Sequence, residues 1–255
     1  MDERIMEKLK SLGEIVLGCA LYYLVCIVSI SFAPADSRQT VACLLFWAVL
    51  VIAFFLGRRL SPHRKGGFFV TLKGARISLC LCALLGGLAL NMLFSGLLPL
   101  LPFPKEWFES YSEASGALAK PSVMRLIDTV VFIPIFEESF YRGIVFDRFT
   151  KLMPTPIAII IASIIFGFAH TTPIWIAYAS IISLIICLIY HSTRSLLPCV
   201  LFHIAFNGTN YILPTRTSIE GNVTVFLIGL LCTALCVTLF VFFLVRTRTE
   251  ARGWA

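Results

Sequence analysis

Three short stretches of this 255-residue sequence place ionisable or amide side chains inside long apolar segments. The stretches read FEESFYR, FGFAH and HIAFN, and all three lie in the second half of the chain. Their polar members are Glu137, Glu138, Arg142, His170, His203 and Asn207. Carboxylate and imidazole groups are the usual side chains of general acid–base chemistry. In an apolar setting such groups are costly, so they predict a functional site, either for hydrolysis or for proton transfer.

The spacing within the first stretch separates two roles for its acids. Glu138 and Arg142 are four residues apart with the acid first, the favourable direction for an ion pair on one helix face. Glu137 is rotated by about 100° from Glu138 and can face another neighbour. We therefore expect Arg142 to neutralise Glu138 and to leave Glu137 for chemistry.

The other two stretches show the same four-residue spacing. Phe166 and His170 share one helix face, and His203 and Asn207 share another. A short loop joins the helices that carry Glu137 and His170, and its position predicts that these two side chains lie at about the same depth and could share a water molecule. Phe166 is interpreted as a residue that shapes the site.

The composition requires a membrane protein. Hydrophobic residues make up 58% of the chain and charged residues only 14%, against about 25% in soluble domains. A cytosolic enzyme and a disordered chain are excluded. The net charge of +7 comes from small clusters between apolar runs, which excludes nucleic acid as a partner and indicates contacts with lipid headgroups. The nine cysteines lie in apolar runs without zinc-binding spacing and are interpreted as packing residues.

The expected fold class is all-α, a polytopic integral membrane bundle of about eight transmembrane helices. The sixth span is short, so seven spans remain an alternative. Fifteen of the 21 Lys and Arg residues fall on one side of the eight-span topology and four on the other, which predicts a cell-membrane protein with both termini in the cytoplasm. The predicted spans are 11–33, 41–57, 78–102, 123–147, 156–173, 175–190, 196–213 and 223–245.

We divide the chain into three parts. Residues 1–122 hold the first three spans, 123–213 form the core that carries the polar stretches, and 214–255 hold the last span and a cytoplasmic tail. The loop 103–122 is expected at the outer interface. Asp128 lies on the helix face opposite Glu137, so it is also placed at an interface.

The three stretches in this order, E-E-x-x-x-R, F-x-x-x-H and H-x-x-x-N, resemble the CPBP family of intramembrane proteases. This family includes CaaX proteases and bacteriocin-processing proteins and is also called Abi. The resemblance covers roughly 123–213 and implies an endopeptidase that hydrolyses a peptide bond in a membrane-associated peptide or protein. The implied roles are a general base for Glu137, water binding for His170, oxyanion stabilisation for His203 and Asn207, and charge balance for Glu138 and Arg142.

A metal-dependent mechanism stays open, because members of this family are often labelled metalloproteases. Glu137, His170 and His203 would then hold one divalent ion such as Zn²⁺, with water as the fourth ligand. The usual H-E-x-x-H motif is absent from the sequence. The metal-free mechanism is favoured slightly because it gives Asn207 a role.

Two other functions fit the same polar residues. One is a non-catalytic immunity or scaffold protein that binds a partner in the same cavity, and the other is a small transporter that uses Glu137 and the histidines as a proton relay. The complete set of motif residues favours the protease, and no inverted repeat supports the transporter. The sequence does not select among prenylated, bacteriocin-precursor and other membrane-peptide substrates.

Overall fold

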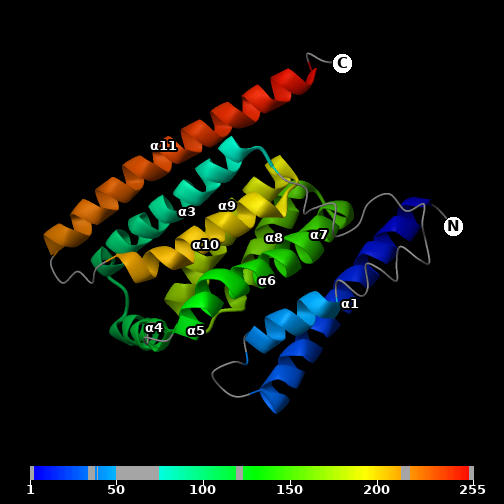
Figure 1. The fold of residues 1–255 in the computed structure, drawn as a ribbon, viewed down its shortest axis with the longest axis horizontal. Coiled ribbons are helices and arrows are strands. Elements are labelled where there is room, and N and C mark those ends of the chain that lie inside the picture. The colour runs from blue at the N-terminus through cyan, green and yellow to red at the C-terminus, as the bar shows by residue number, and fades with distance from the viewer. Residues whose placement is uncertain are drawn as a thin grey trace.

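The computed structural model describes residues 3–33, 38, 40–49, 75–118, 123–213 and 219–252, and all regular structure in these ranges is helical (Figure 1). The flanking helices are α1 (Glu3–Phe32), a helix over Thr40–Val49, α3 (Ile77–Leu97), α4 (Lys105–Leu118) and α11 (Ile219–Arg252). The helices of the motif region are α5 (Val123–Ile127), α6 (Ile133–Phe140), α7 (Asp147–Leu152), α8 (Thr155–Phe168), α9 (Pro173–Thr193) and α10 (Leu196–Ile212).

Four of the described helices, α1, α3, α9 and α11, are long and apolar enough to cross a membrane. Two more apolar helices, Thr40–Val49 and α8, are shorter. Because lipid offers no partner to unpaired backbone groups, a set of long apolar helices defines a multi-pass membrane protein. The prediction of a helical membrane protein is confirmed, whereas the number of spans stays a prediction. Part of the second predicted span, residues 50–57, lies outside the described residues.

One helix runs from α5 through α7 and carries the first polar stretch. It contains two π-helical segments, Asp128–Phe132 and Tyr141–Phe146, which separate α5, α6 and α7. A π-helical turn widens the helix by one residue, and such turns are frequent at functional sites. The first segment precedes Glu137 and the second includes Arg142. Both segments therefore change the direction in which these side chains leave the helix.

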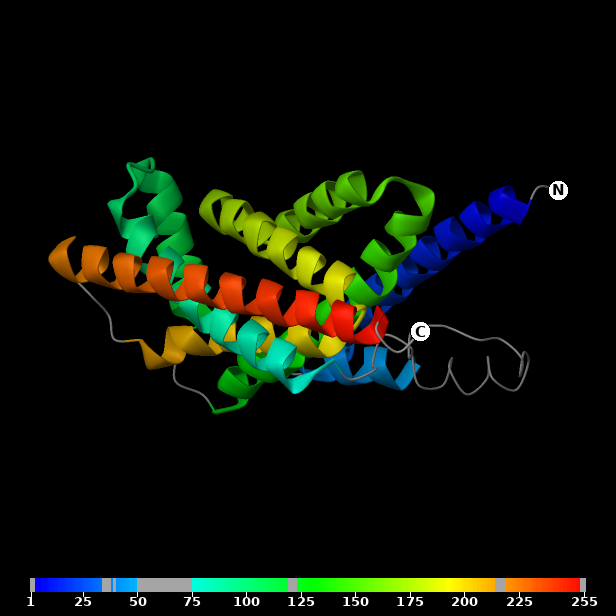
Figure 2. The same cartoon turned by 90° about the horizontal axis from the view of Figure 1, so that it is seen from above.

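The helices lie in a row in which α11 and α3 flank the motif helices on one side and α1 flanks them on the other (Figure 1). Seen from above in Figure 2, α8 and α9 form a separate layer on one side of the α3–α10 pair. Helix α3 contacts both α11 and α10, α8 pairs with α9, and α1 contacts α7. The motif helices are therefore surrounded by protein on several sides, although α8 and α9 also expose apolar side chains.

Glycine makes the close helix contacts. A Cβ atom added at Gly96 of α3 would lie 2.3 Å from the backbone nitrogen of Phe226 in α11, and one at Gly167 of α8 would lie 2.8 Å from the carbonyl oxygen of Ile176 in α9. Small residues let membrane helices approach until their backbones touch. The glycine in α3 therefore allows this helix to pack closely against its neighbour in the interior of the bundle.

Three predictions about individual segments are wrong. The fifth predicted span, 156–173, is too long, since α8 ends at Phe168 and His170 lies in the turn before α9. Asp128 is not interfacial: its side chain is 2% exposed and accepts a hydrogen bond from the Thr40 hydroxyl. The π-helical turn at Asp128 changes the angular spacing on which the placement opposite Glu137 relied. The segment 103–122 is not simply a loop, because α4 forms within it.

Candidate active site

The centre of the site is an ion pair that is completely shielded from solvent. Glu138 on α6 and Arg142 on the second π-helical segment are both 0% exposed, and Arg142 Nη1 donates to Glu138 Oε1 over 3.0 Å. Arg142 Nη2 donates to the Ser183 hydroxyl on α9 over 2.8 Å. The predicted pairing of Glu138 with Arg142 is confirmed. A buried charge needs both a partner and hydrogen bonds, and this guanidinium has both.

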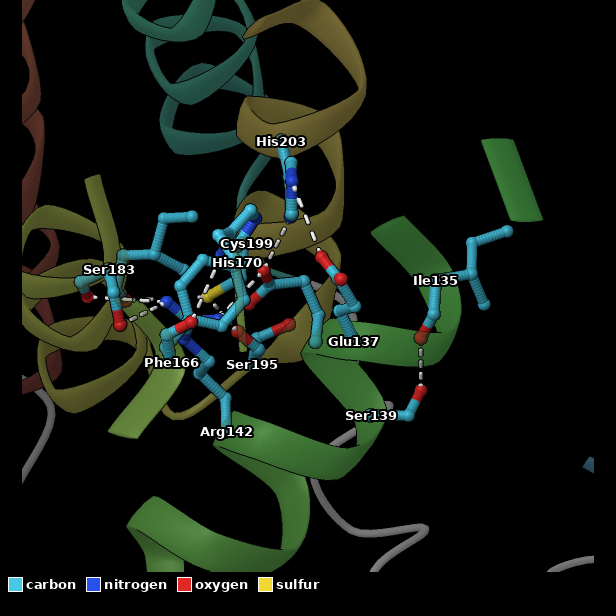
Figure 3. Close-up of polar contacts among 12 residues, drawn as sticks. Ile135, Glu137, Ser139, Arg142, Phe166, His170, Ser183, Ser195, Cys199 and His203 are labelled. Atoms are coloured by element: carbon cyan, nitrogen blue, oxygen red, sulfur yellow. Dashed lines mark hydrogen bonds and ion pairs between the residues drawn. The ribbon is translucent and has the colours of Figure 1, made fainter. Parts of the chain in front are cut away.

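His203 on α10 joins the two glutamates. Its Nδ1 lies 2.8 Å from Glu138 Oε1, so Arg142 and His203 share one carboxylate oxygen. An ionised carboxylate only accepts hydrogen bonds, and His203 Nδ1 must therefore carry the proton of this contact. The other ring nitrogen, Nε2, faces Glu137 Oε2 at 3.7 Å (Figure 3). That separation exceeds a direct hydrogen bond, and a single water could bridge it.

Glu137 is the one carboxylate of this group that reaches the edge of the protein interior. Its side chain is 19% exposed, whereas that of Glu138 is 0% exposed. The two neighbouring acids therefore occupy different environments, as their angular separation on a helix predicts. Glu138 is committed to Arg142 and His203, and Glu137 is accessible to a small reactant.

Phe166 is more central than the sequence indicated. The Arg142 guanidinium carbon lies 4.6 Å from the centre of the Phe166 ring, in cation–π geometry. The same ring lies 5.3 Å from the His170 ring and 6.1 Å from the His203 ring, measured between centroids. Phe166 thus separates the buried charge from His170 and sets the position of both imidazoles.

His170 is held by the end of α8 although it lies outside that helix. Its Nδ1 is 3.1 Å from the Phe166 carbonyl oxygen, which can only accept, so Nδ1 is the donor. Its ring also contacts the indole of Trp175 on α9, with centroids 5.1 Å apart. In this tautomer the neutral ring keeps an unprotonated Nε2 that is able to accept a proton from water.

Asn207 is held one turn beyond His203 on α10. Its amide nitrogen donates to the Thr129 carbonyl oxygen over 3.0 Å. In a π-helical turn this carbonyl would accept from the residue five positions later, which is Pro134 and has no N–H group. The proline therefore leaves a carbonyl without its backbone donor, and Asn207 supplies the missing hydrogen bond.

The structure brings Glu137, Glu138, Arg142 and His203 into one connected group. His170 is connected to this group through the Phe166 ring, and Asn207 through α10 and the first π-helical segment. Among the described residues, no direct hydrogen bond joins Glu137 to His170, so their shared water stays a prediction. Ser183 and Trp175 were not foreseen, because a serine and a tryptophan in an apolar helix carry no distinctive signal in sequence.

The three side chains proposed for a metal do not form a ready ligand set. Within the described ranges, no group of three or more His, Cys, Asp or Glu side chains is placed to hold a metal ion. His203 and His170 each donate from Nδ1 and keep Nε2 unbound, which metal-binding histidines also do, so the misfit lies in the placement of the three side chains and not in these tautomers. The residues of this arrangement do not fit a His₂Glu site, and we derive no step through a metal.

Comparison with known proteins agrees with the motifs. Residues 119–209 match the family described as type II CAAX prenyl endopeptidase Rce1-like. The UPF0177 protein YaiH of Lactococcus lactis subsp. lactis (strain IL1403) is 28% identical over 213 residues, which cover 79% of this chain and 81% of that relative. No solved structure gives a significant match. The family match covers the region of the three polar stretches and agrees with their resemblance to the CPBP, or CaaX-protease, family.

Proposed function

We propose that this protein is an intramembrane endopeptidase of the CaaX-protease type that hydrolyses a peptide bond in a membrane-associated peptide or protein. One observation carries the proposal: His203 Nε2 faces Glu137 across 3.7 Å while His203 Nδ1 is fixed by the buried Glu138–Arg142 pair. A packing device alone would need only the buried pair. A second acid, partly exposed and facing a fixed imidazole, supplies the groups that water activation needs.

Charge balance defines the resting state of the group. Arg142 and Glu138 cancel each other, which leaves one proton to be shared between Glu137 and His203. When His203 holds that proton, Glu137 is a carboxylate and both imidazole nitrogens are donors. This is the form in which Glu137 accepts a proton from water and His203 Nε2–H is free to stabilise negative charge.

The proposed reaction uses these groups in sequence. Glu137 removes a proton from the water, aided by His170, and the water oxygen bonds to the scissile carbonyl carbon. The carbonyl oxygen becomes an oxyanion that accepts from His203 and from the second N–H of the Asn207 amide. The C–N bond then breaks, the oxyanion returns to a carbonyl, and the leaving nitrogen takes the proton from Glu137. A carboxylic acid and an amine are released.

Cleavage of membrane-anchored peptides tests the proposal. The purified protein is reconstituted in vesicles with such peptides, and the products are identified by mass spectrometry. We expect cleavage by the wild type and its loss in Glu137→Ala and in His170→Ala. A scaffold or immunity function is supported instead if the wild type cleaves nothing and both variants keep a partner-binding or protective activity.

A chelator arm addresses the metal question with the same assay. Because the residues present do not fit a His₂Glu site, we expect the rate to stay the same after treatment with a strong chelator. A loss of activity that returns on adding Zn²⁺ alone would contradict the metal-free mechanism. It would leave the protease assignment intact.

A further inference from the structure

Helix α3 contacts the helix that bears His203 and Asn207, although α3 carries no motif residue. Its Asn91 is 2% exposed and reaches across to α10. The Asn91 amide nitrogen donates to the Phe206 carbonyl oxygen over 2.8 Å and to the Asn210 side-chain oxygen over 2.8 Å. Its own side-chain oxygen accepts from the Ser95 hydroxyl over 3.0 Å. The amide nitrogen therefore makes two hydrogen bonds and the amide oxygen one, and together they fix the orientation of this side chain.

A second contact lies one turn earlier on the same face of α3. A Cβ atom added at Gly87 would lie 2.1 Å from the Phe202 carbonyl oxygen, so the two backbones touch at this point. Phe202 directly precedes His203, and Phe206 directly precedes Asn207. Helix α3 therefore contacts the carbonyls that immediately precede the two motif residues of α10, His203 and Asn207.

Two contacts spaced by one helical turn restrict the position of α10 more strongly than a single contact does. A single point leaves a helix free to rotate and to slide, whereas two points fix both its rotation and its height. In an apolar surrounding the Asn91 amide cannot exchange its acceptors for water, and an unsatisfied amide is expensive. A shift of α10 would break these hydrogen bonds and would also change the 3.7 Å separation between His203 and Glu137.

We propose that Asn91, together with Gly87, is a positioning residue that sets the height and rotation of α10 and so aims His203 and Asn207 at the reacting bond. The proposal rests on the proposed endopeptidase function for its catalytic consequence. Its geometric part stands on the contacts of α3 alone. Asn91 touches neither the water nor the substrate and acts only through the backbone of α10.

The test compares Asn91→Ser with Asn222→Ser in the full-length protein in vesicles. Serine at position 91 is too short to reach Phe206 but can satisfy its hydroxyl within its own helix. Asn222 is a matched control, since it is 8% exposed and its carbonyl lies at the Gly96 contact of α3 with α11, away from α10. We expect Asn91→Ser to lower kcat about 100-fold with KM unchanged, the effect of a small misplacement of reacting groups.

Histidine-selective ¹⁵N NMR provides a readout that does not depend on activity. The chain has four histidines, and the His203 signals are assigned by their loss in His203→Gln. We expect Asn91→Ser to shift the His203 signals and Asn222→Ser to leave them in place. Unchanged His203 signals, or equal losses of activity in the two variants, would overturn the positioning role. If the wild type itself cleaves nothing, the proposed function fails, and the NMR comparison alone decides the proposal.

Discussion

The helices α6 and α11 are both apolar, yet they contribute to the molecule in opposite ways. Helix α6 buries Glu138 completely and holds Glu137 beside it. In α11 only 11% of the most apolar stretch is buried inside the protein, and large side chains such as Leu231 and Leu235 are exposed. Helix α11 interacts with its surroundings through its apolar surface, whereas α6 combines apolar packing of Phe136 and Phe140 with buried charge and hydrogen bonds. Substitutions in the two helices should therefore have very different effects.

The largest effect is expected at Glu137. Glu137→Gln keeps the shape of the side chain but removes the base, and we expect the cleavage rate to fall by about 1,000- to 10,000-fold. The rate of peptide cleavage in vesicles measures this, with the thermal unfolding midpoint as the control for folding. Substantial cleavage by a folded Glu137→Gln protein would contradict the assigned role and would remove the contrast with α11.

Breaking the buried ion pair should be the next most severe change. Arg142→Met removes the guanidinium and leaves the buried Glu138 carboxylate with the His203 Nδ1 contact, which we expect to cost about 3–5 kcal/mol of unfolding free energy. Combining it with Glu138→Leu removes both charges and should recover part of that stability, although His203 Nδ1–H then loses its acceptor. Denaturant unfolding of both variants measures the difference. If the double variant is no more stable than Arg142→Met, the cost does not come from an unpaired charge.

A smaller effect is expected at the oxyanion donor. Asn207→Ala removes the amide that bonds to Thr129 and the second donor assigned to the oxyanion, so kcat should fall about 100-fold. Steady-state kinetics separates this from a change in KM, which should be small. A rise in KM at constant kcat would instead assign Asn207 to substrate binding.

The smallest effect is expected on α11. The exposed Thr238 hydroxyl donates to the Ala234 carbonyl of its own helix. We expect Thr238→Val to change the unfolding free energy by less than about 0.5 kcal/mol and to leave the cleavage rate unchanged. The same unfolding and cleavage measurements apply. A large loss in this variant would show that α11 does more than cover α3.

The i, i+4 pairing of Glu138 with Arg142 could be predicted because helical geometry fixes which residues share a face. The position of His170 could not, because helix α8 ends at Phe168, five residues before the end of the span that hydropathy predicts, and His170 lies in the turn that follows. The burial of Asp128 was missed for a related reason: a π-helical turn changes the angular spacing, and no residue pattern announces such a turn. Pro134 lacks the N–H group that the Thr129 carbonyl would otherwise bond. The sequence shows this proline, but its effect on Thr129 follows only once the π-helical turn is known.

The amino-acid sequence by itself determined that this is a helical membrane protein and which few polar residues it places in the apolar medium. Hydropathy and local spacing decide these features, because lipid forces long apolar segments to be helical. Only the tertiary structure decided that His203 contacts both glutamates, that Phe166 lies between the guanidinium and the imidazoles, and that Asn91 of α3 holds α10. These contacts join residues far apart in the chain, and they depend on how helices of similar composition pack against one another.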